Sequence, residues 1–150
     1  MPDGTSRLSK DGQPIFHFMG CSTFAEYAVN PGADLDKMCL LGCGVATGWG
    51  AVFNNTKVEP GTTVAVFGLG ALGLSVIQAA KLAGARYIVG VDINDAKFVK
   101  AKEMGATECV NSITCEGGDV KAWLMGKEKW GYDYTYDCTG NVNVSCLIAQ

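Results

Sequence analysis

The sequence has little of what several classes of protein need. The chain of 150 residues contains one histidine, and its 12 Lys and Arg residues are outnumbered by 15 Asp and Glu residues. No run of basic residues occurs, which argues against a nucleic-acid partner. Met1 is followed by Pro-Asp-Gly instead of a basic patch and an apolar run, so we expect no secretory signal.

The sequence also lacks the patterns of a disulfide framework and of a membrane-spanning segment. The seven cysteines form an odd count without the spacing of a small disulfide-rich domain. Free thiols fit a reducing compartment, so we expect a cytoplasmic protein. The segment Pro60–Ala80 carries no charge, but it contains four glycines and changes character halfway along. We therefore expect no membrane partner.

The first part of the chain predicts hairpins and a helical crossing. Residues 1–30 alternate turn sequences such as KDGQP with short apolar segments, as β-hairpins do. Small apolar residues and glycines over Asp34–Asn55 predict a helical crossing between two structural units. We place the two domains at 1–57 and 58–150.

Strands and helices alternate regularly after Gly61. Runs rich in β-branched residues predict buried strands, and three- and four-residue apolar spacing predicts helices. The expected strands cover 63–68, 87–93, 108–111 and 132–140, and the expected helices cover 71–85, 95–106 and 119–131. This order is typical of an α/β fold with a doubly wound parallel sheet, the Rossmann type. A complete domain of this type has six strands, so four strands predict a partial, truncated sheet.

A glycine pattern joins the first of these strands to the first helix. In VFGLGALG, Gly68, Gly70 and Gly73 stand in G-x-G-x-x-G order, and Asp92 closes the next strand nineteen residues after Gly73. We expect the three glycines to allow a tight turn, the approach of a pyrophosphate and close helix–strand packing, in that order. The predicted cofactor-binding loop is Gly68, Leu69, Gly70, Ala71, Leu72 and Gly73.

Asp92 predicts which dinucleotide binds. A carboxylate at this position accepts hydrogen bonds from the ribose hydroxyls and repels a 2′-phosphate, which favours NAD over NADP. The next residues, Ile93 and Asn94, supply no arginine for that phosphate. Enzymes that bind S-adenosylmethionine also use a glycine-rich loop followed by an acidic residue, so a methyltransferase stays an alternative on this evidence.

Cys43 lies between two glycines in the apolar block LLGCG. A cysteine in such surroundings is usually a small core residue. Paired glycines also allow a ligand or ion to approach the backbone, so a ligand role stays open. Cys39 lies four residues earlier, a helical spacing that could bind metal. For His17, Trp123 and Trp130, a structural or packing role is favoured over a role in binding or catalysis.

Several blocks resemble one family. MPDGTSR, HFMGCSTFAEY, DKMCLLGCGVATGWGAV, VEPGTTVAVFGLGALGLSVIQAA, VDINDAKFVKAKEMGATECVN and DCTGNVNV are similar to the zinc-dependent medium-chain alcohol dehydrogenases, in particular the class III branch, the S-(hydroxymethyl)glutathione dehydrogenases. The resemblance implies a dehydrogenase that uses NAD and zinc to oxidise S-(hydroxymethyl)glutathione and primary alcohols. It also implies a homodimer for the full-length family and a GroES-like, β-rich catalytic domain, of which residues 1–57 would be a remnant.

The resemblance also assigns roles to individual residues. Cys43 takes the position of a catalytic zinc ligand, and Arg7 takes that of an arginine that binds a carboxylate of the glutathione adduct. The positions that contact the dinucleotide in the family correspond here to Thr47 beside the nicotinamide, Lys97 at the adenosine ribose, and Thr139 and Gly140 in the turn after the fourth strand.

Two departures from the family pattern support a second interpretation. The upstream Cys and His ligands of the catalytic zinc are absent, as is the four-cysteine loop of the structural zinc. Catalytic zinc needs three protein ligands. The alternative function is therefore a non-catalytic, NAD-binding fragment that lacks a complete zinc site.

Overall fold

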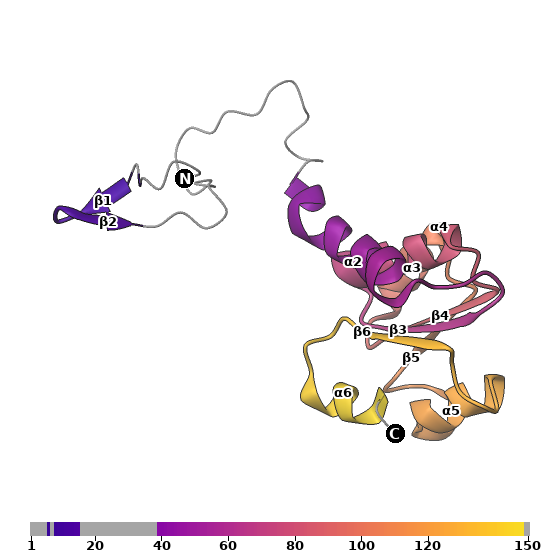
Figure 1. The fold of residues 1–150 in the computed structure, drawn as a ribbon. Coiled ribbons are helices and arrows are strands. Elements are labelled where there is room, and N and C mark those ends of the chain that lie inside the picture. The colour runs from indigo at the N-terminus through magenta and orange to yellow at the C-terminus, as the bar shows by residue number, and fades with distance from the viewer. Residues whose placement is uncertain (1–5, 7, 16–38, 149–150) are drawn as a thin grey trace. The chain divides into compact units, whose positions relative to one another are not determined.

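The computed structural model describes residues 6, 8–15 and 39–148 (Figure 1). The chain divides into two compact units, Met1–Leu35 and Asp36–Gln150. The second unit includes the helical segment before the sheet. The division into domains at 1–57 and 58–150 stays a prediction.

The described part of the first unit is a β-hairpin. Strands β1 (Leu8–Lys10) and β2 (Gln13–Ile15) pair antiparallel, with Leu8 opposite Ile15. Asp11 and Gly12 both have positive φ angles, 51° and 76°. Two consecutive residues of this kind form the tight turn that matches the twist of a two-stranded hairpin. The predicted hairpin is confirmed for these residues.

The second unit is built on a four-stranded parallel sheet. Its strands are β3 (Thr63–Phe67), β4 (Tyr87–Asp92), β5 (Glu108–Asn111) and β6 (Tyr134–Asp137). They run in the order β5-β4-β3-β6. The order reverses between β3 and β6, and in open α/β sheets ligands bind at the carboxyl ends of strands beside such a reversal. The predicted fold class is confirmed.

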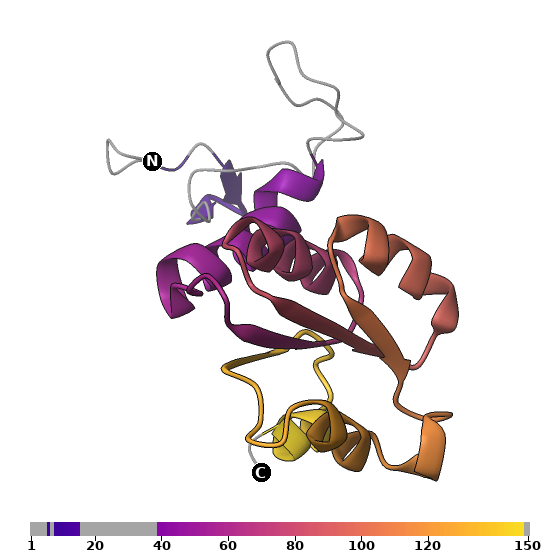
Figure 2. The same cartoon turned by 90° about the vertical axis from the view of Figure 1, so that its right-hand side faces the viewer.

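Helices cover both faces of this sheet. The helices are η2 (Leu41–Val45), α2 (Ala46–Gly50), η3 (Ala51–Thr56), α3 (Ala71–Leu82), η4 (Asp95–Lys97), α4 (Phe98–Met104), η5 (Glu116–Gly118), α5 (Val120–Lys127) and α6 (Val142–Ile148). Helices are thus present in the expected segments 71–85, 95–106 and 119–131, and residues 41–56 of the expected crossing are helical too. Figures 1 and 2 show α2, α3 and α4 on one face and α5 and α6 on the other.

The two faces of β3 supply two apolar cores. Val64 and Val66 pack into the core under α3, whereas Ala65 and Phe67 pack into the core with Leu124 of α5. This alternation follows from the two-residue period of a strand, and burial on both faces explains why every residue of β3 after Thr63 is apolar.

Two tryptophans, the last helix and the uncharged segment can be compared with the sequence-based expectations. Trp123 packs against the core on the α5 side, as predicted. The packing prediction for Trp130 is wrong, because this side chain is 93% exposed and lies under the Lys129 ammonium. Helix α6 was not predicted. The uncharged segment Pro60–Ala80 forms β3 and most of α3, and none of the described helices is long and apolar enough to cross a bilayer.

Candidate functional site

The loop after β3 depends on two of its glycines for its shape. Gly68 has φ +88°, and a Cβ atom there would lie 2.8 Å from the carbonyl oxygen of Cys138. A Cβ atom on Gly73 would lie 1.9 Å from the carbonyl oxygen of Gly68. The first glycine therefore permits the turn beside β6, and the last lets α3 approach the loop. Both roles agree with the prediction.

Gly70 serves a different purpose. No atom lies within 4 Å of a Cβ atom built on it, so the space beside its backbone is open. It occupies the N-cap of α3, which has no side-chain cap. The first backbone N–H groups of a helix have no partner within the helix, and they attract anions. The start of α3 thus presents uncapped N–H groups next to open space, as a phosphate group requires.

Asp92 ties the end of β4 to this loop. Its Oδ2 atom accepts hydrogen bonds from the backbone N–H of Leu69 (2.7 Å) and from Lys97 Nζ (2.9 Å). Its Oδ1 atom accepts from the backbone N–H of Asn94 (2.9 Å). Because a carboxylate offers about four acceptor positions, one is left for a ligand hydroxyl.

These hydrogen bonds also set the ionisation of Asp92. Burial opposes the charged form, but the hydrogen bonds from Leu69, Lys97 and Asn94 outweigh it and lower the pKa of Asp92 below its ordinary value. The carboxyl group is therefore an anion at neutral pH, even though its residue is only 7% exposed.

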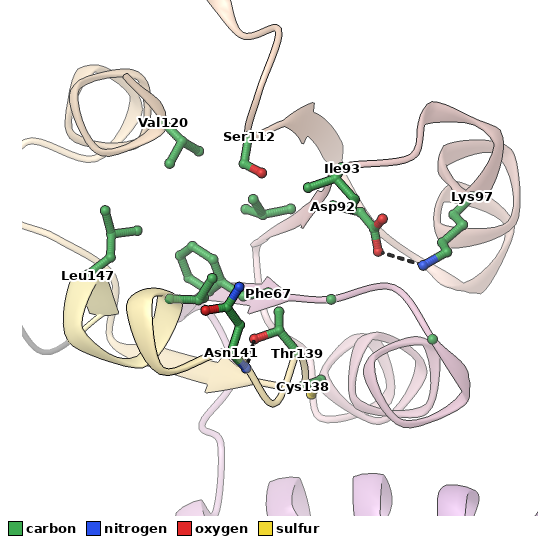
Figure 3. A pocket seen from close by; sticks show the side chains of 14 residues that line it. Phe67, Asp92, Ile93, Lys97, Ser112, Val120, Cys138, Thr139, Asn141 and Leu147 are labelled. Atoms are coloured by element: carbon green, nitrogen blue, oxygen red, sulfur yellow. Dashed lines mark hydrogen bonds and ion pairs between the residues drawn. The ribbon is translucent and has the colours of Figure 1, made fainter. Parts of the chain in front are cut away.

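A pocket of about 350 Å³ lies at the carboxyl edge of the sheet (Figure 3). It brings together residues from the loops after all four strands and from α5 and α6. Its lining consists of Phe67, Gly68, Gly70, Val91, Asp92, Ile93, Lys97, Ser112, Val120, Cys138, Thr139, Asn141, Val144 and Leu147. The pocket thus combines an open loop, a carboxylate and an apolar wall, as the site of a nucleotide does.

The turn after β6 is held by Asp137. Its Oδ1 atom accepts from the backbone N–H (2.9 Å) and the hydroxyl (2.7 Å) of Thr139. Hydrogen bonds from the Ser145 hydroxyl and from Thr139 lower the pKa of Asp137. Gly140 then takes φ +68°. Thr139 lines the pocket and Gly140 does not. Contact of either residue with a dinucleotide stays a prediction.

Cys43 and Thr47 lie on the helical segment 39–56, which packs against α3. A Cβ atom on Gly48 would lie 2.7 Å from Ser75 Cβ, so the two helices touch at this glycine. A Cβ atom on Gly44 would lie 3.5 Å from Ala71 Cβ, at the loop end of α3. The side chains of Cys43 and Thr47 are exposed. Neither lines the pocket, although both belong to the turns nearest its glycine loop.

Metal ligands do not gather within the described residues. No three His, Cys, Asp or Glu side chains among residues 39–148 and the hairpin come together in a way that could hold a metal ion. Cys43 alone does not meet the three-ligand requirement of catalytic zinc, and the described residues therefore do not fit that ion by themselves. His17 and Cys21 lie outside the described residues, as does Arg7.

The structure therefore places some of the predicted site residues in one pocket and others outside it. Gly68, Gly70, Asp92, Lys97 and Thr139 line one pocket. The remaining loop residues support it from behind: Leu69 and Gly73 are buried, and Ala71 and Leu72 form the first turn of α3. Sequence reasoning missed the far wall of the pocket, which consists of Ser112, Val120, Asn141, Val144 and Leu147. Ser112 and Asn141 could have been predicted as site residues, because each directly follows a predicted strand.

Comparison with known proteins identifies relatives of this arrangement. The zinc-binding dehydrogenase family matches residues 71–148. Alcohol dehydrogenase class-3 of Caenorhabditis elegans is 54% identical over 95% of this chain. S-(hydroxymethyl)glutathione dehydrogenase of Escherichia coli O1:K1 / APEC is 52% identical over 96% of it. Among solved structures, benzyl alcohol dehydrogenase from Acinetobacter calcoaceticus superposes with a TM-score of 0.72 at 34% identity over 80% of this chain and 32% of its own.

The chain spans about 40% of the length of these curated relatives. These relatives are alcohol and S-(hydroxymethyl)glutathione dehydrogenases by name, and NAD and zinc are the cofactors that the sequence predicts. A methyltransferase is not supported. The matched residues cover more than half of the chain and contain α3 to α6 and the strands β4, β5 and β6, whereas β3 and the start of the glycine loop precede them. The chain therefore belongs to the zinc-binding dehydrogenase family.

Proposed function

We propose that this chain provides the dinucleotide-binding part of an enzyme that oxidises S-(hydroxymethyl)glutathione and primary alcohols with NAD. In this reaction the alcohol carbon gives a hydride to the nicotinamide and its hydroxyl gives up a proton. A primary alcohol then yields an aldehyde and S-(hydroxymethyl)glutathione yields a formyl thioester, each together with NADH. The pocket would hold NAD with its pyrophosphate on the loop Gly68–Gly73.

One observation carries this proposal. The Asp92 carboxylate is fixed by the Leu69 backbone at 2.7 Å, directly beside the open space at Gly70. A carboxylate that could accept hydrogen bonds from ribose hydroxyls thus lies next to helix N–H groups that could bind a phosphate, as in the dinucleotide-binding pattern. The identity of 52–54% to class III enzymes supports the choice of substrates.

The charges around Asp92 support NAD over NADP. Lys97 is the cation at this position, and its ammonium lies 2.9 Å from Asp92 Oδ2. Because Lys97 is already paired with Asp92, a 2′-phosphate would gain no unpaired cation here and would lie against the Asp92 carboxylate.

Fluorescence titration with NADH and NADPH tests the proposal. We expect the wild-type chain to bind NADH more tightly than NADPH. Asp92→Ala should weaken NADH binding by about 1.5–3 kcal/mol, the range for losing charge-assisted hydrogen bonds. It should weaken NADPH binding less, because Lys97 is then free to meet the 2′-phosphate.

Asp95→Ala is the matched control for this titration. This variant removes the same charge three residues later, from an exposed side chain whose Oδ1 atom accepts a hydrogen bond from Asn111 Nδ2. It should leave the preference for NADH unchanged. Equal curves for NADH and NADPH with the wild-type chain would contradict the proposal.

A second candidate function follows from the metal ligands. Because the described residues supply no three-ligand group, the chain could bind NAD without catalysing oxidation. Assays with S-(hydroxymethyl)glutathione, NAD and added zinc separate the two functions. NADH binding without turnover favours the non-catalytic module, whereas turnover that disappears in Cys43→Ser favours the enzyme.

Three expectations stay predictions at this stage. They are the contact of Arg7 with a carboxylate of the glutathione adduct, pairing of the chain into a homodimer, and a cytoplasmic location. An Arg7→Ala variant that raises KM for the glutathione adduct but not for a simple alcohol would support the first.

A further inference from the structure

Two neighbouring loops line the pocket beside Asp92. One follows β4 and contributes Ile93 and Lys97, and the other follows β5 and contributes Ser112. Figure 3 shows Ile93 and Ser112 at the same end of the pocket as Asp92. Loops are more mobile than the strands they follow unless side chains tie them down. The shape of this end of the pocket therefore depends on what joins the two loops.

The side chain of Asn111, the last residue of β5, joins them. Its Nδ2 group donates to the carbonyl oxygen of Ile93 (3.1 Å) and to Oδ1 of Asp95 (2.6 Å), both in the loop after β4. Its Oδ1 atom accepts from the backbone N–H groups of Ile113 (2.8 Å) and Thr114 (3.2 Å), both in the loop after β5. One side chain thus forms hydrogen bonds to both loops.

These four partners fix the orientation of the Asn111 amide. The two partners after β4 are a carbonyl and a carboxylate, which only accept, so the amide nitrogen faces them. The two partners after β5 are N–H groups, which only donate, so the amide oxygen faces them. An asparagine amide has two hydrogens and two lone pairs to offer, and all four positions are used. Because Asn111 does not line the pocket, it can affect a ligand there only through the loops.

The bond from Asn111 to Asp95 bears on the groups around the Asp92 carboxylate. Asp95 is the first residue of η4, and Lys97 is the last. The Lys97 ammonium pairs with Asp92 Oδ2 at 2.9 Å. Directly before Asp95, the backbone N–H of Asn94 donates to Asp92 Oδ1 at 2.9 Å. A shift of Asp95 would therefore disturb the partners of both carboxylate oxygens.

We infer that Asn111 is a positioning residue for the dinucleotide. It holds the loop that carries Asp92 and Lys97 against the loop that carries Ser112, and its hydrogen bond to Asp95 is the link through which it does so. The inference rests on the proposed function, because it concerns the affinity for NAD. Loss of this link weakens dinucleotide binding although every residue that lines the pocket is unchanged.

Asn111→Asp tests this inference with little change in shape. The variant keeps an oxygen for the N–H groups after β5, but it places a second carboxylate against that of Asp95, so the two side chains repel. Asp95→Asn added to this variant restores a donor and an acceptor with their roles exchanged. Asn94→Asp is the matched control, because it adds the same charge to the same loop. Its Oδ1 atom accepts from the Ala96 N–H at 3.0 Å, a bond that aspartate keeps, and it does not line the pocket.

The measurements are titrations with NADH and ADP-ribose at a temperature where circular dichroism shows each variant to be folded. For Asn111→Asp we expect the Kd of both ligands to rise about tenfold, as for loss of a hydrogen bond to a charged group. The double variant should bind within about threefold of wild type, since only the bond to the Ile93 carbonyl is still missing. Asn94→Asp should stay within about twofold, as expected for an exposed charge. A residue that only stabilised the chain would change the melting temperature and leave these Kd values unchanged.

Each outcome decides between distinct claims. If the wild-type chain binds NADH and Asn111→Asp binds it equally well, the inference is wrong and the proposed function stands. A double variant that binds as weakly as Asn111→Asp also overturns the inference, since Asp95 would then not be the link. A wild-type chain that binds neither NADH nor ADP-ribose contradicts the proposed function, and the inference with it.

A second variant serves if Asn111→Asp is unfolded at the temperature of the titration. Asn111→Ser adds no charge, and its single hydroxyl hydrogen cannot bond both partners after β4. We expect its Kd for NADH and ADP-ribose to rise about fivefold, as for loss of one hydrogen bond. A Kd equal to that of the wild type would overturn the inference.

Discussion

At the scale of single residues, the pocket depends on glycines whose substitution has different consequences. Gly73→Ala would place a methyl group 1.9 Å from the Gly68 carbonyl oxygen, so α3 must move. We expect a loss of about 1–3 kcal/mol in the free energy of unfolding, typical of overpacking. Gly70→Ala meets no atom within 4 Å, so it should fold normally but bind NADH more weakly, because the methyl group occupies the space for the pyrophosphate. Urea denaturation and NADH titration of both variants measure this, and a Gly73→Ala variant as stable as Gly70→Ala would contradict it.

Asp92 should also contribute to stability in a pH-dependent way. Its folded pKa is lowered from the ordinary value of 3.8, so the ionised group stabilises the fold above that value, and this contribution is lost as the pH falls through the folded pKa. Asp92→Asn should therefore be less stable than wild type at pH 7 and at pH 5, and the difference should shrink below about pH 4. Urea denaturation at these pH values checks the sign. A difference that grows as the pH falls would be inconsistent with a lowered pKa.

At the scale of elements, the contact between the segment 39–56 and α3 positions Cys43 and Thr47. Gly48→Val would force a side chain against Ser75 Cβ, where even a Cβ atom lies at 2.7 Å. We expect it to destabilise the chain by about 1–3 kcal/mol. Gly42→Ala, in the same segment, meets nothing within 4 Å and should be neutral or stabilising by up to about 1 kcal/mol. Thermal melting of the two variants tests whether this helix contact exists, and equal melting temperatures would argue against it.

Local patterns predict the strands and their helices well, because each is decided by residues close in sequence. The apolar run Thr63–Phe67 and the glycine pattern after it require no knowledge of the rest of the chain. Helix α6 escaped prediction because it is only seven residues long and begins at the asparagine cap Asn141 instead of a strong apolar period.

The site was predictable on its polar side only. Gly68, Gly70 and Asp92 could be predicted because the spacing of the glycines and the acidic residue is that of a dinucleotide-binding loop. The apolar wall from α5 and α6 depends on how helices far apart in the chain pack beneath the sheet. Likewise, the hydrogen bond from Leu69 to Asp92 joins residues 23 apart, which no local pattern specifies.

At the scale of the whole molecule, we expect the chain to bind NAD without binding zinc. With Cys43 as the single zinc-ligand position matched from the family, we expect no stoichiometric zinc and no alcohol oxidation by the 150-residue chain, since catalytic zinc needs three protein ligands. Metal analysis after gel filtration measures this, with Cys43→Ser and Cys39→Ser compared side by side. One tightly held zinc per chain that is lost in Cys43→Ser would mean that a site forms with residues outside the described ranges.

The central claim is that the pocket at the carboxyl edge of the sheet binds NAD. Nuclear magnetic resonance of the ¹⁵N-labelled chain, with NAD added stepwise, tests it most directly, because each backbone amide reports on its own surroundings. The account predicts saturable shifts of the Leu69, Gly70 and Thr139 amides. Absence of shifts, or shifts concentrated away from the glycine loop, would contradict it.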